Sequence, residues 1–215
     1  MEIKKEYRDS ILFFRLGDFY EMFFDDAILA SKELEITLTQ RDCGMEKKAP
    51  MCGIPYHVAD GYVAKLVEKG YKVAICEQVE DPATAKGIVK REVIKVVTPG
   101  TITDTSILDD KTNNFLASIY LDDLGLGIAY VDNSTGEMYT TEFIGDKDRS
   151  YDFLLDELGK IFPSEIICNE EFNSNSKFIK VLRNSIDPYM SIYSIDNFGV
   201  DFEKTILDQF KKSSM

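Results

Sequence analysis

The pattern of apolar residues near the start of the chain changes from that of a strand to that of a helix. The run from Ile11 to Leu16 is almost entirely apolar and ends at Gly17, which is typical of a strand buried on both faces. From Asp18 onward the apolar positions follow helical spacing. We predict a helix that starts near Asp18 and whose apolar face carries Phe23, Phe24, Ala27, Ile28, Ser31 and Leu34.

The rest of the first half combines short strands with one further helix. Residues 2–9 are typical of a short charged helix or arm, and residues 36–39 are rich in β-branched side chains. Charges, Gly44 and Pro50 predict a loop over residues 40–52. A helix is predicted from about Tyr56 to Glu68, closed by Gly70, and strands are predicted over 72–78 and 90–97. The pattern therefore predicts a mixed-sheet α/β domain over residues 1–98.

The second half follows a polar, turn-rich segment over residues 99–114, which we interpret as a linker. Three strands at 115–120, 127–131 and 137–143 are joined by short turns. A helix at 151–161, a strand at 165–168, a helix at 177–183 and a strand at 190–193 follow. By fold analogy this order predicts a ribonuclease H-like α/β domain over residues 115–200, with 201–215 beginning a truncated helical region.

Charge is distributed unevenly along this acidic chain. The formal net charge is −13, with −2 in residues 1–98 and −11 in residues 99–215. Phosphates would be repelled by the second half, so any nucleic acid should bind the first half. No apolar run approaches the roughly 18 residues of a membrane span, and the N-terminus lacks the apolar core of a secretory signal. The four cysteines and the single His57 have no metal-ligand spacing, so we expect reduced thiols in a cytoplasmic protein.

The stretch Gly17–Glu21 admits two interpretations. Asp18 and Glu21 have the spacing of a helix capping box, and Phe19 could pack against Phe23 four residues later. Alternatively, Phe19 and Glu21 project outward from the turn and form a binding site. The structural alternative requires neither an aromatic residue at that position nor so many aromatic residues in one short stretch.

Four sequence blocks resemble the MutS family of DNA mismatch-repair proteins. They are Leu16–Phe23, Gly53–His57, Ala74–Gln78 with Asp81-Pro82-Ala83, and Val97–Thr101. The blocks follow the family's order and cover most of residues 1–101. Residues 115–200 resemble the family's connector domain through weaker motifs, chiefly Asp132–Gly136.

The resemblance implies a mismatch-recognition domain followed by a connector domain. Its Phe-x-Glu signature falls on Phe19 and Glu21, which would read mispaired or unpaired bases from the minor groove of double-stranded DNA. Arg41 and Arg91 lie where the family places DNA contacts, and solvated surface charges are the alternative for both. Asp18 and Met51 are further candidate contacts, with a place in the core as the alternative for Met51. The resemblance further implies contact of the connector domain with MutL, and self-association, ATP and Mg²⁺ in the full-length protein. We expect a nucleoid-associated cytoplasmic location.

The sequence contains no Gly-x-x-x-x-Gly-Lys-[Ser/Thr] phosphate loop, so we expect no ATPase activity and no cofactor in this fragment. One alternative function is a metal-dependent nuclease, in which Asp122, Asp132 and Glu137 of a ribonuclease H-like domain would hold two metal ions. A structural explanation is that these residues stabilise turns, because they lie at hairpin ends, where Asp side chains commonly hydrogen-bond to the nearby backbone. A second alternative is a module that only docks other proteins.

Overall fold

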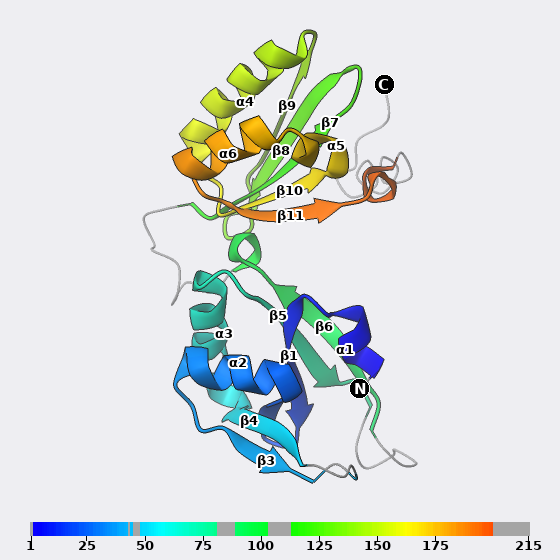
Figure 1. Ribbon diagram of the computed structural model, residues 1–215, viewed down its shortest axis with the longest axis vertical. Helices are drawn as coiled ribbons and strands as arrows, with labels where there is room; N and C mark the ends of the chain where they lie inside the picture. The colour runs from blue at the N-terminus through cyan, green and yellow to red at the C-terminus, as the bar shows by residue number, and fades with distance from the viewer. Residues whose placement is uncertain (1, 43, 45–47, 81–88, 103–112, 200–215) are drawn as a thin grey trace. The chain divides into compact units, whose positions relative to one another are not determined.

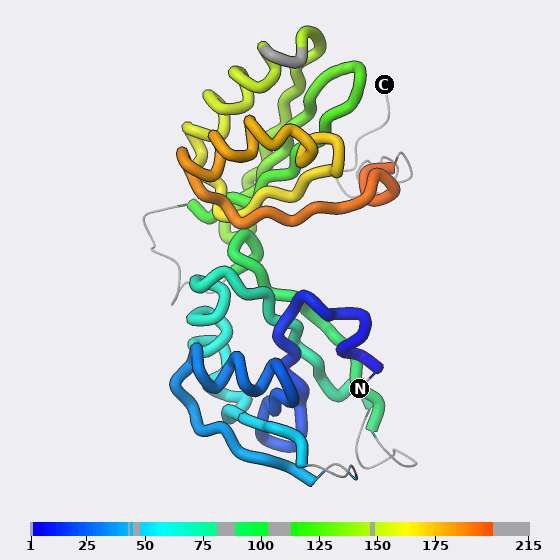
Figure 2. The backbone as a smooth tube through the Cα atoms, viewed as in Figure 1, coloured from blue at the N-terminus to red at the C-terminus, as the bar shows by residue number. Residues whose placement is uncertain are grey.

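The computed structural model of the protein describes residues 2–42, 44, 48–80, 89–102 and 113–199, with the backbone alone at 147–148. The chain separates into two compact units, residues 1–110 and 111–215, and each has its own sheet and hydrophobic core (Figures 1 and 2). The Asp81-Pro82-Ala83 part of the third sequence block, residues 103–112 of the predicted linker and the predicted helical start at 201–215 lie outside the described residues.

The first unit is built on a six-stranded sheet with the order β3-β4-β2-β1-β5-β6. β1 and β5 are parallel, whereas the other neighbouring pairs are antiparallel. β1 lies between β2 and β5, a central place in the sheet that agrees with the prediction of a strand buried on both faces. The strands are β1 (Ser10–Leu16), β2 (Phe19–Phe23), β3 (Thr39–Arg41), β4 (Ala49–Pro55), β5 (Lys72–Gln78) and β6 (Arg91–Val97).

Two helices, α2 (Phe24–Leu34) and α3 (Ala59–Glu68), pack on one face of this sheet, with the 3₁₀ turn η1 (Tyr56–Val58) leading into α3. Phe13, Met22 and Leu66 are fully buried between the sheet and the helices. The opposite face is here named the open face, and it carries Leu12, Phe14, Leu16, Phe19, Glu21 and Phe23. The short helix α1 (Glu2–Glu6) covers one end of it, where Ile3 and Tyr7 pack near Leu12.

The predicted helix start at Asp18 is wrong, because Phe19–Phe23 forms the strand β2 and the helix begins only at Phe24. β1 and β2 form a hairpin in which Leu16 pairs with Phe19 around the two-residue turn Gly17-Asp18. Gly17 has a φ angle of +59°. This conformation favours glycine, and a positive φ suits the first position of a two-residue hairpin turn.

The predicted loop over residues 40–52 is wrong at both ends. β3 extends to Arg41 and β4 begins at Ala49, so both ends of the segment lie in the sheet. β4 buries Ala49, Cys52 and Ile54 and pairs with both β2 and β3. β4 therefore helps to complete the core, whereas the three residues of β3 are exposed.

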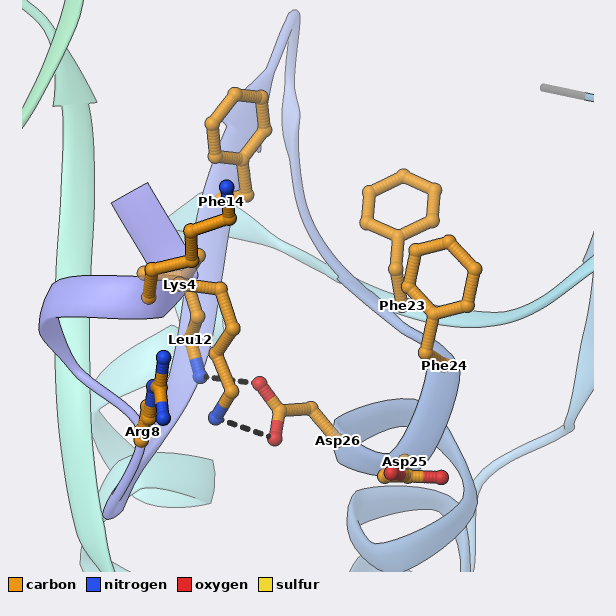
Figure 3. Close-up of a pocket in the computed structure, with 9 residues that line it drawn as sticks. Lys4, Arg8, Leu12, Phe14, Phe23, Phe24, Asp25 and Asp26 are labelled. Atoms are coloured by element: carbon orange, nitrogen blue, oxygen red, sulfur yellow. Dashed lines mark hydrogen bonds and ion pairs between the residues drawn. The ribbon is translucent and has the colours of Figure 1, made fainter. Parts of the chain in front are cut away.

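Asp26, in the first turn of α2, supports β1 beyond the end of its pairing with β2. Its carboxylate accepts hydrogen bonds from the backbone N–H of Leu12 at 3.0 Å and from Nζ of Lys4 at 2.8 Å (Figure 3). The pairing of β1 with β2 ends at Phe14, so Leu12 is not paired with a residue of β2. The carboxylate takes the place of a strand partner there.

We expect Asp26→Ala to lower the free energy of unfolding of the first unit by about 1–3 kcal/mol, because it leaves the N–H of Leu12 without its acceptor inside the protein. Chemical denaturation followed by circular dichroism measures the change. Asp25→Ala is the matched control, since Asp25 lies in the same helical turn and is exposed. Equal effects of the two substitutions would contradict the role assigned to Asp26.

The second unit has a five-stranded sheet with the order β11-β10-β7-β8-β9. Its first three strands form an antiparallel meander, and β10 pairs in parallel with both β7 and β11. The strands are β7 (Phe115–Leu121), β8 (Gly125–Asp132), β9 (Met138–Ile144), β10 (Glu165–Asn169) and β11 (Tyr189–Tyr193), and the helices are α4 (Lys147–Ile161), α5 (Glu170–Ser174) and α6 (Ser176–Ser185).

The core of the second unit lies between its sheet and these helices, where Leu154, Leu158 and Leu182 pack against Ile119 and Ile166. The predicted mixed α/β class is confirmed for both units. The strand order of the second unit is consistent with the predicted ribonuclease H-like fold. Among the described residues, no helix is both long and apolar enough to cross a bilayer.

Candidate functional site

The open face of the first unit carries the residues of the candidate site. Side chains of β2 alternate, so Tyr20 and Met22 are buried against the helices while Phe19 and Glu21 point to the open face. The ring of Phe19 is 47% exposed. The predicted packing of Phe19 against Phe23 through helical spacing is wrong, because both residues belong to a strand.

The tip of the β1–β2 hairpin is held by the neighbouring strand β4. Phe19 pairs with Pro55, and the backbone N–H of Tyr56 donates a hydrogen bond of 2.9 Å to the carbonyl oxygen of Asp18. Asp18 itself is exposed and caps no helix, since none begins there. Its structural contribution is a backbone contact that fixes the turn immediately before Phe19.

A polar cluster supports the same hairpin from the helix-covered face. The hydroxyl group of Tyr20 donates a hydrogen bond to Glu77 of β5, and Arg15 lies 3.4 Å from the same carboxylate oxygen. The guanidinium group of Arg15 also stacks 3.7 Å from the ring centroid of Tyr56. Burial, together with the hydrogen bond to Glu77, raises the pKa of Tyr20 to about 12. The cluster therefore keeps a neutral tyrosine bonded to a carboxylate at neutral pH.

Glu21 forms an ion pair with Arg41 of β3 on the open face. The capping-box interpretation of Glu21 is wrong, because Glu21 is the middle residue of β2 and not the third residue of a helix. The carboxylate therefore belongs to the open face, two positions along the strand from Phe19. Residues two apart on a strand are separated by roughly 7 Å on the same face, so one ligand can contact both.

Two further predicted site residues also lie on the open face. Met51 is the register partner of Phe23 and is half-buried. Arg91 of β6 stacks 5.2 Å from the ring centroid of Phe14 and donates hydrogen bonds to the carbonyl oxygens of Arg15 at 2.9 Å and Val89 at 2.7 Å. The sheet thus brings Phe19, Glu21, Arg41, Met51 and Arg91 to one face.

A groove of about 230 Å³ lies on the same face between α1 and the start of α2 (Figure 3). Phe14, Phe23 and Phe24 supply aromatic walls, and Lys4 and Arg8 bring positive charge. The sequence analysis missed this groove, because it assigned Phe23 and Phe24 to the buried face of a helix. A signal that was present is the adjacent apolar pair Met22-Phe23, since one of two adjacent strand residues must face away from the helix-covered face.

The carboxylates of the nuclease alternative do not form one site. Asp122 accepts hydrogen bonds from the backbone N–H groups of Leu124 and Gly125 at the start of β8, whereas Asp132 ends that strand. An eight-residue strand separates the two by a distance on the order of 20 Å, far more than the spacing of ligands around paired metal ions. Glu137 follows Asp132 in the next turn, where its side chain accepts a hydrogen bond from Tyr139.

Asp132 has a turn-forming role instead. It is completely buried, and its carboxylate accepts hydrogen bonds from the backbone N–H of Ser134 at 2.8 Å and from the hydroxyl group of Ser134 at 2.6 Å. Burial alone would raise the pKa of this carboxyl group, but the hydrogen bonds from Ser134 bring it below the ordinary value. The motif Asp132–Gly136 thus forms the β8–β9 turn.

The described cysteines are buried thiols. Cys52, Cys76 and Cys168 are free, and burial raises the pKa of each to about 11. They are protonated at neutral pH and unsuited to nucleophilic chemistry. Cys43 lies outside the described residues.

Comparison with known proteins places both units in one family. Residues 1–106 match the family model described as MutS domain I, and residues 114–215 match MutS domain II. The chain is 58% identical over 195 residues to the DNA mismatch repair protein MutS of Alkaliphilus oremlandii, covering 90% of this chain and 22% of that protein. It is 54% identical over 216 residues to the protein of the same name from Ruminiclostridium cellulolyticum, covering 100% of this chain and 24% of that protein.

A third relative with that name, from Clostridioides difficile, is 52% identical over 202 residues, covering 94% of this chain and 20% of that protein. The chain therefore spans less than a quarter of the length of these relatives. Since the two domain models match consecutive regions that correspond to the two compact units, the chain belongs to the MutS family.

Proposed function

We propose that the chain recognises mispaired or unpaired bases in double-stranded DNA, with Phe19 as a wedge that enters the minor groove and Glu21 as the group that contacts the displaced base. The observation that carries this proposal is the 47% exposed ring of Phe19 at the tip of a hairpin fixed by β4 and by the Tyr20–Glu77 contact. The names of the relatives support the choice of mismatched DNA as the ligand.

Selection between matched and mismatched DNA follows from the cost of opening a base step. Inserting an apolar wedge into a stacked step costs a few kcal/mol, and stacking a base on an aromatic ring returns about 1–3 kcal/mol. At a matched step these terms roughly cancel. A mispaired base is already poorly stacked and paired, so the same insertion becomes favourable there, and specificity comes from deformability.

Glu21 adds a polar contact beside the wedge. An ionised carboxylate accepts a hydrogen bond from a thymine imino N–H, whereas contact with a purine N7 requires the protonated acid as donor. The charge of the ionised form also repels phosphates, which disfavours close approach to an undistorted duplex. Around this pair, we assign Asp18, Arg41, Met51 and Arg91 as flanking DNA contacts on the open face.

The proposal is tested by replacing the matching N-terminal residues of Ruminiclostridium cellulolyticum MutS with this chain and measuring DNA binding by fluorescence anisotropy. The ligands are duplexes that differ only in a central G·T mispair, an unpaired thymine or a matched pair. We expect tighter binding of the first two duplexes at each of several salt concentrations. Equal affinity for all three would refute the proposed function.

We assign to the second unit the role of a connector that docks MutL and relays DNA binding to parts of the protein outside this chain. ATP and Mg²⁺ binding and self-association would belong to those parts. The net charge of −11 over residues 99–215 supports docking of a basic protein surface rather than DNA.

We expect deletion of residues 115–199 from the same hybrid protein to reduce its recruitment of MutL to mismatched DNA, because the proposed docking surface is removed. Co-sedimentation of MutL with DNA-bound hybrid protein measures this effect. Undiminished recruitment would exclude the docking role.

A further inference from the structure

The ion pair between Glu21 and Arg41 joins one half of the proposed base-reading pair to a neighbouring strand. Arg41 is the last residue of β3, and its guanidinium group donates a hydrogen bond to Oε2 of Glu21. Twenty positions separate the two residues in sequence, and β4 lies between their strands in the sheet. The pair therefore forms only when β2, β3 and β4 are assembled.

Gly53 of β4 lies directly beside Glu21, between the strand of Glu21 and β3. Gly53 is the register partner of Glu21. A Cβ atom at this position would lie 3.5 Å from Cγ of Glu21 and 3.3 Å from the carbonyl oxygen of Tyr20. The side chain of Glu21 thus lies beside a residue without a side chain, on the route toward β3.

The two partners differ in exposure. The side chain of Glu21 is 16% exposed, whereas that of Arg41 is 48% exposed. Exposed ion pairs contribute little to folding, because solvent screens them and ordering long side chains is costly. Stabilising the sheet is therefore a weak explanation for the ion pair between Glu21 and Arg41. Orienting the carboxylate of Glu21, the more buried partner, explains it specifically.

We propose that Arg41 is a positioning residue for Glu21, which holds the carboxylate against the open face in the orientation from which it meets a base beside Phe19. This inference rests on the proposed function and deepens it. On this inference, Arg41 has a different role from that of a cation that only binds a phosphate. A phosphate contact acts equally on matched and mismatched duplexes, whereas an orienting contact acts through Glu21 and therefore on discrimination.

The test is a double-mutant cycle in the hybrid protein, with Arg41→Gln, Glu21→Gln and both together. Dissociation constants for the G·T and matched duplexes give the ratio of affinities for each variant. We expect Arg41→Gln to reduce this ratio roughly three- to tenfold, in the range of couplings between contacting residues. In the Glu21→Gln background, the same substitution should leave the ratio unchanged, because the group that Arg41 orients is already altered.

Two control variants sharpen the cycle. Arg41→Lys retains a cation that can pair with Glu21, and it should preserve most of the ratio. Lys95→Gln removes the same charge from an exposed position on the helix-covered face, opposite Ile75, and should leave the ratio unchanged. Thermal unfolding of each variant checks that the first unit remains folded.

The inference would be overturned if Arg41→Gln weakened binding of both duplexes equally, and if Glu21→Gln left that effect unchanged. The slope of log affinity against log salt concentration would then fall by about one, which would make Arg41 a phosphate contact only. That result leaves the proposed function intact, because the unsubstituted protein still discriminates. Loss of discrimination in the unsubstituted protein would instead refute the proposed function, and the inference with it.

Discussion

Replacement of Phe19 with alanine should abolish the preference of the hybrid protein for mismatched over matched duplex. The ring supplies the stacking energy of about 1–3 kcal/mol that offsets opening of the base step. Losing it corresponds to a loss of roughly 5- to 160-fold in affinity for the mismatched duplex. Matched duplex should bind almost as before, because Phe19 does not enter a stacked step. Anisotropy titrations with the two duplexes measure both affinities.

The fold of the first unit should tolerate this substitution. Phe19 is 47% exposed and contributes no side chain to the described core, so the midpoint of thermal unfolding should change little. Phe24→Ala is a matched control, because Phe24 is 41% exposed but lies beyond the end of β2, at the groove. Unchanged discrimination in Phe19→Ala, or equal losses in both variants, would contradict the wedge.

The sequence pattern predicts several strands whose signal is local. The segments at 72–78 and 115–120 fall within observed strands. β5 carries the apolar run Val73–Cys76, and buried and half-buried positions alternate along most of β7. The helix predicted over 151–161 also lies within α4. Each of these elements is specified by residues within one short window.

The β1–β2 hairpin was not predictable in the same way. β2 has the sequence Phe-Tyr-Glu-Met-Phe, in which aromatic residues occupy both faces, so the alternation of a half-buried strand is masked. Phe19, which is exposed, and Glu21, which is half-buried, point to the open face and not into the core. A strand with aromatic residues on its open face loses the polar signal by which half-buried strands are recognised.

The candidate site residues Phe19 and Glu21 came from the family resemblance, but the contacts that hold them did not. Tyr20 and Glu77 are separated by 57 positions, and Glu21 and Arg41 by 20. Only the strand order and register bring each pair together. Residues from three of the four blocks, Tyr20, Tyr56 and Glu77, meet around one hairpin tip through contacts with one another and with Arg15.

The substitution with the largest expected effect on stability is Phe13→Ala. Phe13 is fully buried on the central strand β1, and its ring centroid lies 6.0 Å from that of Tyr20. Emptying such a site costs about 3–5 kcal/mol, a large part of the 5–15 kcal/mol that stabilises a typical domain. We expect the first unit to be largely or entirely unfolded at 37 °C in this variant, with loss of mismatch binding.

The second unit should remain folded in the same variant, because its core consists of residues from β7 to α6 and shares no side chain with the core around Phe13. Scanning calorimetry of the 215-residue chain should therefore lose the transition of the first unit and retain that of the second. Phe14→Ala is the control, since Phe14 is the next residue but half-buried on the open face, and it should lower stability by a smaller amount. If Phe13→Ala removed both transitions together, the two units would be one cooperative folding unit. A loss of mismatch binding in any destabilised variant could then no longer be assigned to the first unit alone.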